Sequence, residues 1–264
     1  MVNLLVAAAL AAASPAVAPA AQPNADPAIF VVRDADTTVY IFGTFHALDG
    51  QSEWFNDQVK DAFEQSHELV LETLIPEDLP SPGASAPLRV PSVAASASFL
   101  ATTRMAISAG KTQGMQVGNG ADMVLRHAAE LEGKPVEGLE TLESQLAMFT
   151  RMPPTAPQTE PRAGTPVAAS PMESLTKSMA EMQSAWKRGD QSVFVRMLDQ
   201  LRQASPDTYR VMFTERNARW ADWIAARMQT PGTVFVAVGA GHLAGDDSLL
   251  VRLAELRIPS ARLN

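Results

Sequence analysis

Apolar residues in this chain fall into short runs and into longer periodic segments. Short runs rich in Val, Ile and Phe predict β-strands. We expect strands at residues 28–33, 38–43, 69–71, 135–139, 233–238 and 261–263. The run 233–238 is the clearest buried strand, and 261–263 is expected at a sheet edge. The short turn Asp34-Ala35-Asp36 should join the first two strands as a hairpin.

Segments whose apolar residues recur three and four positions apart predict helices. They are residues 53–66, 98–109, 121–132, 172–187, 190–203, 206–228 and 246–256. Gly133 is expected to end the third of these, and Ser205 to cap the sixth, with Pro206 at its first position. Asp246 or Asp247 is expected to cap the last. Strands interspersed with helices predict an α/β fold with a mixed central sheet, flanking helices and a largely helical middle region.

The N-terminus has the pattern of an export signal. Residues 4–13 form an apolar run that is too short to span a bilayer, and small-residue cleavage patterns follow around Ala18. We therefore expect a signal peptide at residues 1–21 and a periplasmic or secreted protein. The segment before the apolar run lacks Lys and Arg, which leaves a misassigned start, an uncleaved anchor or a buried Ala-rich helix as alternatives.

Two proline-rich stretches interrupt the rest of the chain. Residues 76–91 contain five prolines and residues 153–171 contain six, with little periodicity. Such composition predicts exposed loops. We expect residues 22–264 to form a single domain that carries these two loops.

Composition and charge narrow the partners and the chemistry. A formal net charge of -8 disfavours binding to nucleic acid or to anionic lipid, because phosphate binding needs clustered Lys and Arg. We expect a peptide or small-molecule partner, and no stable membrane span after signal removal. The chain has no Cys and four His, so any metal site must be built from His and carboxylate groups.

Two of the four His follow strands at the same offset. Gly43-Thr44-Phe45-His46 follows the strand 38–43, and Gly239-Ala240-Gly241-His242 follows the strand 233–238. Glycine permits a sharp or left-handed turn, after which each His can fold back over the sheet edge where α/β proteins gather ligands. The pairing predicts one shared site, although a single such motif would more often hold a His satisfied by local backbone groups. His67 and His127 lack this context and are expected to be structural.

Two carboxylates also stand at strand ends. Glu72 ends the strand 69–71, so in a mainly parallel sheet it should meet both Gly-x-x-His motifs at one edge. Glu140 follows the weaker strand 135–139. The alternatives are a solvated strand-end residue for Glu72 and a residue at the start of the next helix for Glu140.

Five segments together resemble the TraB/GumN family, which is related to the Tiki proteases. They are, in order, IFGTFH at 41–46, LVLE at 69–72, GLET at 138–141 with Gln145, ERN at 215–217 with Trp220, and VAVGAGHL at 236–243. The resemblance covers about residues 30–258 and weakens over both proline-rich stretches. The fixed order of five segments is far more specific than any one of them.

The resemblance implies a metal-dependent, protease-like hydrolase that acts on a peptide or another small amide or ester. Carried over by position, the site is His46, His242, Glu72 and Arg216, with the two His and Glu72 as metal ligands. These donors suit Mn, Zn or Co. Arg216 would stabilise an oxyanion, and either Glu140, or Glu72 if it is not a ligand, would be the general base.

Two alternatives to this site and its activity stay open. Arg216 lies on a predicted helix with other arginines, so it is also consistent with a solvated face residue, and its neighbour Asn217 is equally open. Other relatives are described as binding or limiting peptide pheromones, and related folds bind haem or open macrolide lactones. The resemblance is therefore also consistent with a non-catalytic peptide-, haem- or metal-binding protein that sequesters its ligand.

Overall fold

The structure is a computed structural model that describes residues 25–51, 53–74, 105–151 and 171–264. The predicted signal peptide, residues 98–104 of one predicted helix and almost all of the two predicted proline-rich loops lie outside these residues. Pro171 is the exception, because it begins a helix.

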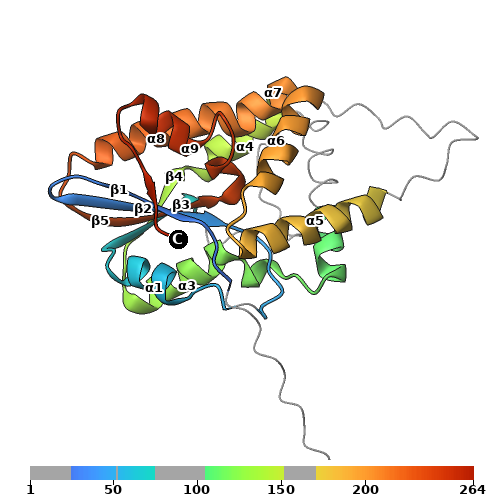
Figure 1. Cartoon of the computed structure of the whole chain (residues 1–264), viewed down its shortest axis with the longest axis horizontal. Coiled ribbons are helices and arrows are strands. Elements are labelled where there is room, and N and C mark those ends of the chain that lie inside the picture. Colours follow the sequence, from blue (N-terminus) through green and yellow to red (C-terminus); the bar gives the residue numbers. More distant parts are fainter. Residues whose placement is uncertain (1–24, 52, 75–104, 152–170) are drawn as a thin grey trace, which may run out of the picture.

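A six-stranded mixed sheet forms the centre of the domain (Figure 1), with the strand order β4-β3-β5-β2-β1-β6. β2, β5, β3 and β4 run parallel to one another, and β1 is antiparallel to both β2 and β6. The predicted mixed sheet is thus confirmed, with the short strand near the C-terminus at one edge. Its strands are β1 (Ile29–Arg33), β2 (Thr37–Thr44), β3 (Glu68–Thr73), β4 (Val136–Glu140), β5 (Gly232–Gly239) and β6 (Ala261–Arg262).

Helices cover both faces of the sheet. They are α1 (Asp57–Glu64), residues 105–112, α3 (Ala121–Glu132), α4 (Leu142–Thr150), α5 (Pro171–Lys187), α6 (Ser192–Ala204), α7 (Pro206–Tyr209), α8 (Glu215–Arg227) and α9 (Leu249–Glu255), with single turns η1 (Val117–Asn119) and η3 (Ala240–Leu243) and a π-helical segment η2 (Arg210–Thr214). Figure 1 shows α8 and α9 on one side of the sheet and α1 and α3 on the other.

The alternation of side chains along each strand builds two cores. Phe42, Leu71 and Phe235 point to the face covered by α1, α3, α5 and α6. Their chain neighbours Ile41, Val70 and Val236 point to the opposite face, which α8 and α9 cover. Since both faces are buried, the central strands are apolar at almost every position, as is typical of parallel strands between helical layers.

Helix starts differ from the sequence predictions where a different residue supplies the cap. α1 begins at Asp57 rather than near residue 53, because the side chain of Asn56 accepts a hydrogen bond from the Val59 amide at 3.3 Å. The prediction that Asp246 or Asp247 caps the last helix is wrong. Ser248 is the cap, with its hydroxyl accepting from the Val251 amide at 3.3 Å.

The predicted helix at 206–228 is continuous but not uniform. Ser205 is the N-cap and Pro206 follows at the start of the helix, as predicted. The Ser205 hydroxyl, however, donates to the hydroxyl of Thr208 at 2.7 Å and does not accept from a backbone amide. The π-helical segment η2 then interrupts the α-helical pattern. Such segments are frequent at functional sites, because the extra residue re-aims the side chains around it.

Among the described residues, no helix combines the length and the apolar character that crossing a bilayer requires.

Candidate functional site

The carboxyl ends of four parallel strands meet at one edge of the sheet. Thr44 at the end of β2 pairs with Gly239 at the end of β5, and Thr73 of β3 pairs with Glu140 at the end of β4. Each Gly-x-x-His motif therefore leaves the sheet at the same edge. The structure brings the two motif His, Glu72, Glu140 and Arg216 together there, although they come from five different elements or loops.

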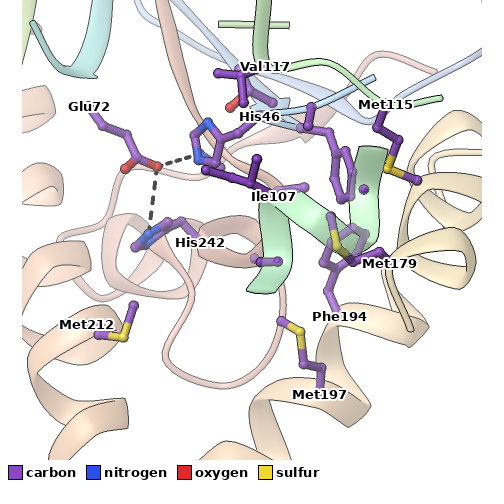
Figure 2. Close-up of a pocket in the computed structure, with 18 of the residues that line it drawn as sticks. His46, Glu72, Ile107, Met115, Val117, Met179, Phe194, Met197, Met212 and His242 are labelled. Carbon is purple, nitrogen blue, oxygen red and sulfur yellow. Dashed lines mark hydrogen bonds and ion pairs between the residues drawn. The ribbon is translucent and has the colours of Figure 1, made fainter. Parts of the chain in front are cut away.

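A pocket of about 860 Å³ lies at this edge. One end is polar, and Glu72 lies there between the imidazoles of His46 and His242 (Figure 2). The guanidinium of Arg216 also lines this end. The remaining walls are mostly apolar and are formed by Phe45, Ile107, Met115, Val117, Met179, Phe194, Met197, Met212 and Phe213, among others.

His242 is buried, and its hydrogen bonds define its tautomer. Its Nε2 lies 3.2 Å from Nη1 of Arg216, and its Nδ1 lies 2.7 Å from Oδ1 of Asn217. Because an arginine can only donate, Nε2 must accept, and the ring proton is on Nδ1, which donates to Asn217. Asn217 is oriented in turn by donating to the carbonyl of Asp247 at 2.7 Å. Trp220 packs against the same ring with a centroid distance of 4.5 Å.

His46 is held differently, by a carboxylate on a helix that is distant in sequence. Its Nδ1 lies 3.2 Å from Oδ1 of Asp122, in the first turn of α3. The start of α3 lies directly against the loop that carries His46: the amide of Ala121 donates to the carbonyl of Phe45 at 3.0 Å. A Cβ on Gly120 would come within 2.4 Å of the His46 carbonyl oxygen, so only glycine allows this approach.

Arg216 links the carboxylates and His242 into one network. Its Nη2 donates to Oε2 of Glu72 and to Oε1 of Glu140, both at 2.7 Å, and its Nε lies 3.2 Å from Oε2 of Glu140. The Arg216 side chain is only 5% exposed, which excludes the alternative of a solvated face residue. Glu140 does not line the pocket; both of its oxygens hold the guanidinium in place.

The two His have opposite electrostatic surroundings. Burial lowers the pKa of His242 to about 3, even though the charge of Glu72 acts to raise it. Desolvation also lowers the pKa of His46, but the hydrogen bond and charge of Asp122, together with the charge of Glu72, outweigh it and raise that pKa to about 9. The His46 side chain is 63% exposed, and this exposed surface contributes to the pocket. His46 is thus a cation near neutral pH, and His242 is neutral.

Glu72 remains ionised over a wide pH range. Burial alone would raise its pKa, but His242, Arg216 and His46 lower it, and the amide of Gly239, which donates to Oε1 at 2.6 Å, adds to this effect. The resulting pKa is about 2. Glu72 is therefore a carboxylate anion between the two imidazoles at neutral pH.

The motif glycines serve a purpose that differs from the sequence interpretation. Neither Gly43 nor Gly239 has a positive φ, so of the sharp or left-handed turn that the sequence allowed, the left-handed form is absent at both glycines. A Cβ on Gly43 would lie 3.2 Å from Cα of Ala240, and a Cβ on Gly239 would lie 3.1 Å from Oε1 of Glu72 and 3.5 Å from Nε2 of His46. Each glycine therefore makes room for residues of the other motif, and the two motifs interlock.

Sequence reasoning missed the residue that holds His46 and left open the one that holds His242. Asp122 carries no motif, and its only sequence signal is its place in the first turn of a helix after the glycine-rich run 118–120. Asn217 was marked only by its place beside Arg216. The other two His lie outside the pocket lining: Nδ1 of His67 accepts from the Thr233 amide at 3.3 Å, and His127 is exposed on α3.

The donor atoms are of the types that bind divalent metal ions, although an arginine already engages some of them. Both imidazoles have Nδ1 engaged and present Nε2 on the side of Glu72, which is how second-shell partners orient metal-binding His. Nε2 of His242 lies 3.8 Å from Oε1 of Glu72. Among the described residues, no group of three or more His, Asp or Glu has the geometry to hold a metal ion. The nitrogens of Arg216 engage both Nε2 of His242 and Oε2 of Glu72.

Comparison with known proteins identifies the family. None of the curated proteins and none of the solved structures matches the chain. A family model described as the TraB/PrgY/gumN family matches residues 28–90 and 87–258, which include both Gly-x-x-His motifs, Glu72, Glu140 and Arg216. The match spans most of the chain, and the chain therefore belongs to the TraB/PrgY/gumN family.

Proposed function

We propose that this protein is an exported hydrolase that uses a divalent metal ion to cleave an amide or ester bond in a peptide or another small substrate. One observation carries the proposal: two imidazoles from matching motifs present Nε2 to one ionised carboxylate at the polar end of a large pocket. His46, His242 and Glu72 would hold the ion. When bound, it would lower the pKa of a water molecule and polarise the scissile carbonyl.

The residues around these ligands have separate tasks in the proposal. Asp122 and Asn217 hold the imidazoles of His46 and His242 through Nδ1. Nε2 is therefore the nitrogen with which each His would bind the ion. Arg216 lines the pocket and would stabilise negative charge on the carbonyl oxygen. Glu140 positions Arg216 and does not act as the base, because it is outside the lining and both of its oxygens face the guanidinium.

Arg216 and a bound metal ion would draw on some of the same donor atoms. Arg216 supplies the positive charge that balances Glu72 and Glu140. Of the proposed ligands, His242 and Glu72 also contact Arg216, whereas Glu140 contacts the guanidinium alone among the site residues. Glu140 would therefore keep Arg216 paired when His242 and Glu72 hold the ion.

The self-paired network also favours a second candidate, a binding protein without turnover. Arg216 already satisfies Glu72, Glu140 and His242, so the polar end is stable as it stands. Such a protein would sequester a peptide, haem or metal ion in the pocket. The two candidates differ in one property, which is metal-dependent turnover.

The deciding experiment is an assay for cleavage on purified mature protein. The protein is stripped with a chelator, reloaded separately with Mn, Zn or Co, and incubated with a fluorogenic peptide library and a panel of esters. We expect cleavage that needs the metal, is lost in His46→Ala and persists in the control His127→Ala. Ligand binding without turnover under every metal would reject the hydrolase and favour the sequestering protein.

Export has its own support and its own test. The apolar run at 4–13 and the small residues near Ala18 suit a periplasmic or secreted protein. We expect the mature protein to begin just after Ala18, Ala20 or Ala21, as measured by mass spectrometry of exported material. An intact Met1 on that material would reject the signal peptide.

A further inference from the structure

Methionines from three separate segments line the pocket away from its polar end. Met115 precedes η1, Met179 lies on α5 and Met197 lies on α6. Figure 2 shows these side chains and Phe194 on the side of the pocket away from Glu72, with Ile107 between them and His46, whereas Met212 lies near His242. Because the three methionines come from different segments, this wall forms only when the chain folds and is not the face of one amphipathic helix.

Two other apolar residues of the pocket lining are unusually exposed. Ile107 is 40% exposed and Val117 is 49% exposed, although both line the pocket. Within the described residues they face a cavity of about 860 Å³, which is within the size range of small-molecule sites. Apolar side chains gathered around a cavity of this size mark a ligand-binding surface and not a packed core.

The helix at 105–112 contacts two of these methionines and lines the pocket beside them. A Cβ on Gly110 would lie 3.2 Å from Cε of Met179 and 3.5 Å from Cβ of Met115, so the helical backbone lies directly against these side chains. The methionines are thus held in place by backbone contacts, while their flexible thioether chains can still adjust. Unbranched, polarisable side chains of this kind suit a slender apolar ligand of variable length better than one rigid shape.

We infer that this methionine wall, defined as Met115, Met179 and Met197, is the subsite for a linear apolar chain attached to the carbonyl carbon of the substrate. The inference rests on the proposed function for the place of the carbonyl, which Arg216 and the metal ligands fix at the polar end. The chain then extends from that carbonyl into the apolar part of the pocket. A fatty acyl group and a linear side chain of a peptide, such as that of methionine or norleucine, share this chemistry.

The test measures binding, so that it does not depend on turnover. Metal-free protein is titrated by calorimetry with primary amides from butanamide through hexanamide to octanamide. We expect the affinity to rise by about fourfold for each added methylene, the value for burial of one CH₂ group. Met179→Gln and Met197→Gln should each weaken octanamide binding by about tenfold while leaving butanamide binding unchanged. Met123→Gln is the matched control, since Met123 is 38% exposed on α3 and outside the pocket lining.

A second series identifies the source of the chain. The N-acetyl amides of alanine, methionine and norleucine carry the linear chain as an amino-acid side chain. A steeper rise along the acyl series assigns the subsite to an acyl group, and a steeper rise along the amino-acid series assigns it to a peptide side chain. Circular dichroism of each variant confirms that it is folded.

The outcomes separate this inference from the proposed function. Affinity that does not depend on chain length overturns the inference, whether or not the protein hydrolyses amides. Equal slopes in Met179→Gln, Met197→Gln and Met123→Gln overturn it as well. Binding that depends on chain length and on the wall, with no turnover under any metal, supports the subsite and rejects the hydrolase.

Discussion

The two Gly-x-x-His motifs have one pattern in the sequence and two environments in the structure. His242 is 6% exposed at its side chain, is held by the neutral Asn217, and has a pKa of about 3. His46 is 63% exposed, is held by the carboxylate of Asp122, and has a pKa of about 9. The motif therefore sets where each His lies, and residues distant in sequence set its charge. Two His with the same motif therefore place one buried, neutral imidazole and one accessible, charged imidazole at the same carboxylate.

The largest expected effect is on the His242 side of this comparison. Arg216→Met would leave the buried Glu72 and Glu140 without their shared cation. We expect a loss of about 3–5 kcal/mol in the free energy of unfolding, the range for breaking a buried ion pair from one side. Urea denaturation of Arg216→Met and of the exposed control Arg188→Met measures it. Equal stability of the two variants would contradict the network described above.

The two residues that hold the imidazoles give a more direct comparison. Asn217→Ala leaves the buried Nδ1 of His242 without an acceptor, so we expect a loss of about 1–3 kcal/mol in unfolding free energy. Asp122→Ala should cost less, because water can reach the exposed ring of His46. Both variants should lower metal affinity by about 10–100-fold, as removal of outer-shell partners does. Thermal unfolding and metal titration of both variants test this. A larger stability loss in Asp122→Ala than in Asn217→Ala would contradict the view that His242 is the buried imidazole and His46 the accessible one.

The motif glycines should separate folding from function. Gly239→Ala places a methyl group against Glu72 and His46, so it should impair metal binding and turnover while costing about 1 kcal/mol of stability. Gly43→Ala instead presses on the backbone of Ala240 and should disturb the junction of the two motifs with a similar stability loss. Metal titration distinguishes them: we expect the larger loss of affinity in Gly239→Ala. An unchanged affinity in Gly239→Ala would contradict the close approach of these three residues.

The effects of pH on stability have opposite signs for the two His. The pKa of His46 rises from 6.5 to about 9 on folding, so its stabilising contribution is present below about pH 6.5 and is lost as pH rises towards 9. The pKa of His242 falls from 6.5 to about 3, so stability decreases as pH falls from about 6.5 towards 3. Glu72 adds a loss as pH falls from 4.5 towards 2.

Proton NMR of the imidazole resonances in metal-free protein tests these directions. We expect one resonance to titrate near pH 9 and to disappear in His46→Ala, and another to remain unprotonated down to acid pH and to disappear in His242→Ala. If the resonance lost in His46→Ala and the resonance lost in His242→Ala both titrate near pH 6.5, the two environments are alike and the comparison fails.

The sequence predicted the parts of this site that depend on local pattern. Strands leading into His46, Glu72 and His242 were evident from apolar runs, and a parallel sheet then places their ends at one edge. The reason for the motif glycines was not evident, because the close approach of Gly43 to Ala240 and of Gly239 to Glu72 exists only after the strands have paired. The local pattern therefore left a sharp turn and a left-handed turn open, and the backbone has no left-handed residue at Gly43 or Gly239.

Contacts between distant segments account for the rest. Asp122 reaches His46 only because the start of α3 packs on the loop after β2, and Arg216 is buried only because Glu72 and Glu140 end neighbouring strands. A helix periodicity cannot tell a solvated arginine from one that neutralises two carboxylates. The cap of α9 was also misjudged. Asp246, Asp247 and Ser248 can all cap a helix, and the sequence alone does not show that Ser248 is the residue that does so.

The most direct test of the central proposal is titration calorimetry with Mn, Zn and Co on four proteins: wild type, His46→Ala, His242→Ala and the control His127→Ala. The account predicts one divalent ion per wild-type chain, release of about one proton near neutral pH as the ion replaces the proton on His46, and the same behaviour in His127→Ala. His46→Ala and His242→Ala should each bind at least about 10-fold more weakly. Equal metal binding by all four proteins would contradict a shared metal site at the two motifs.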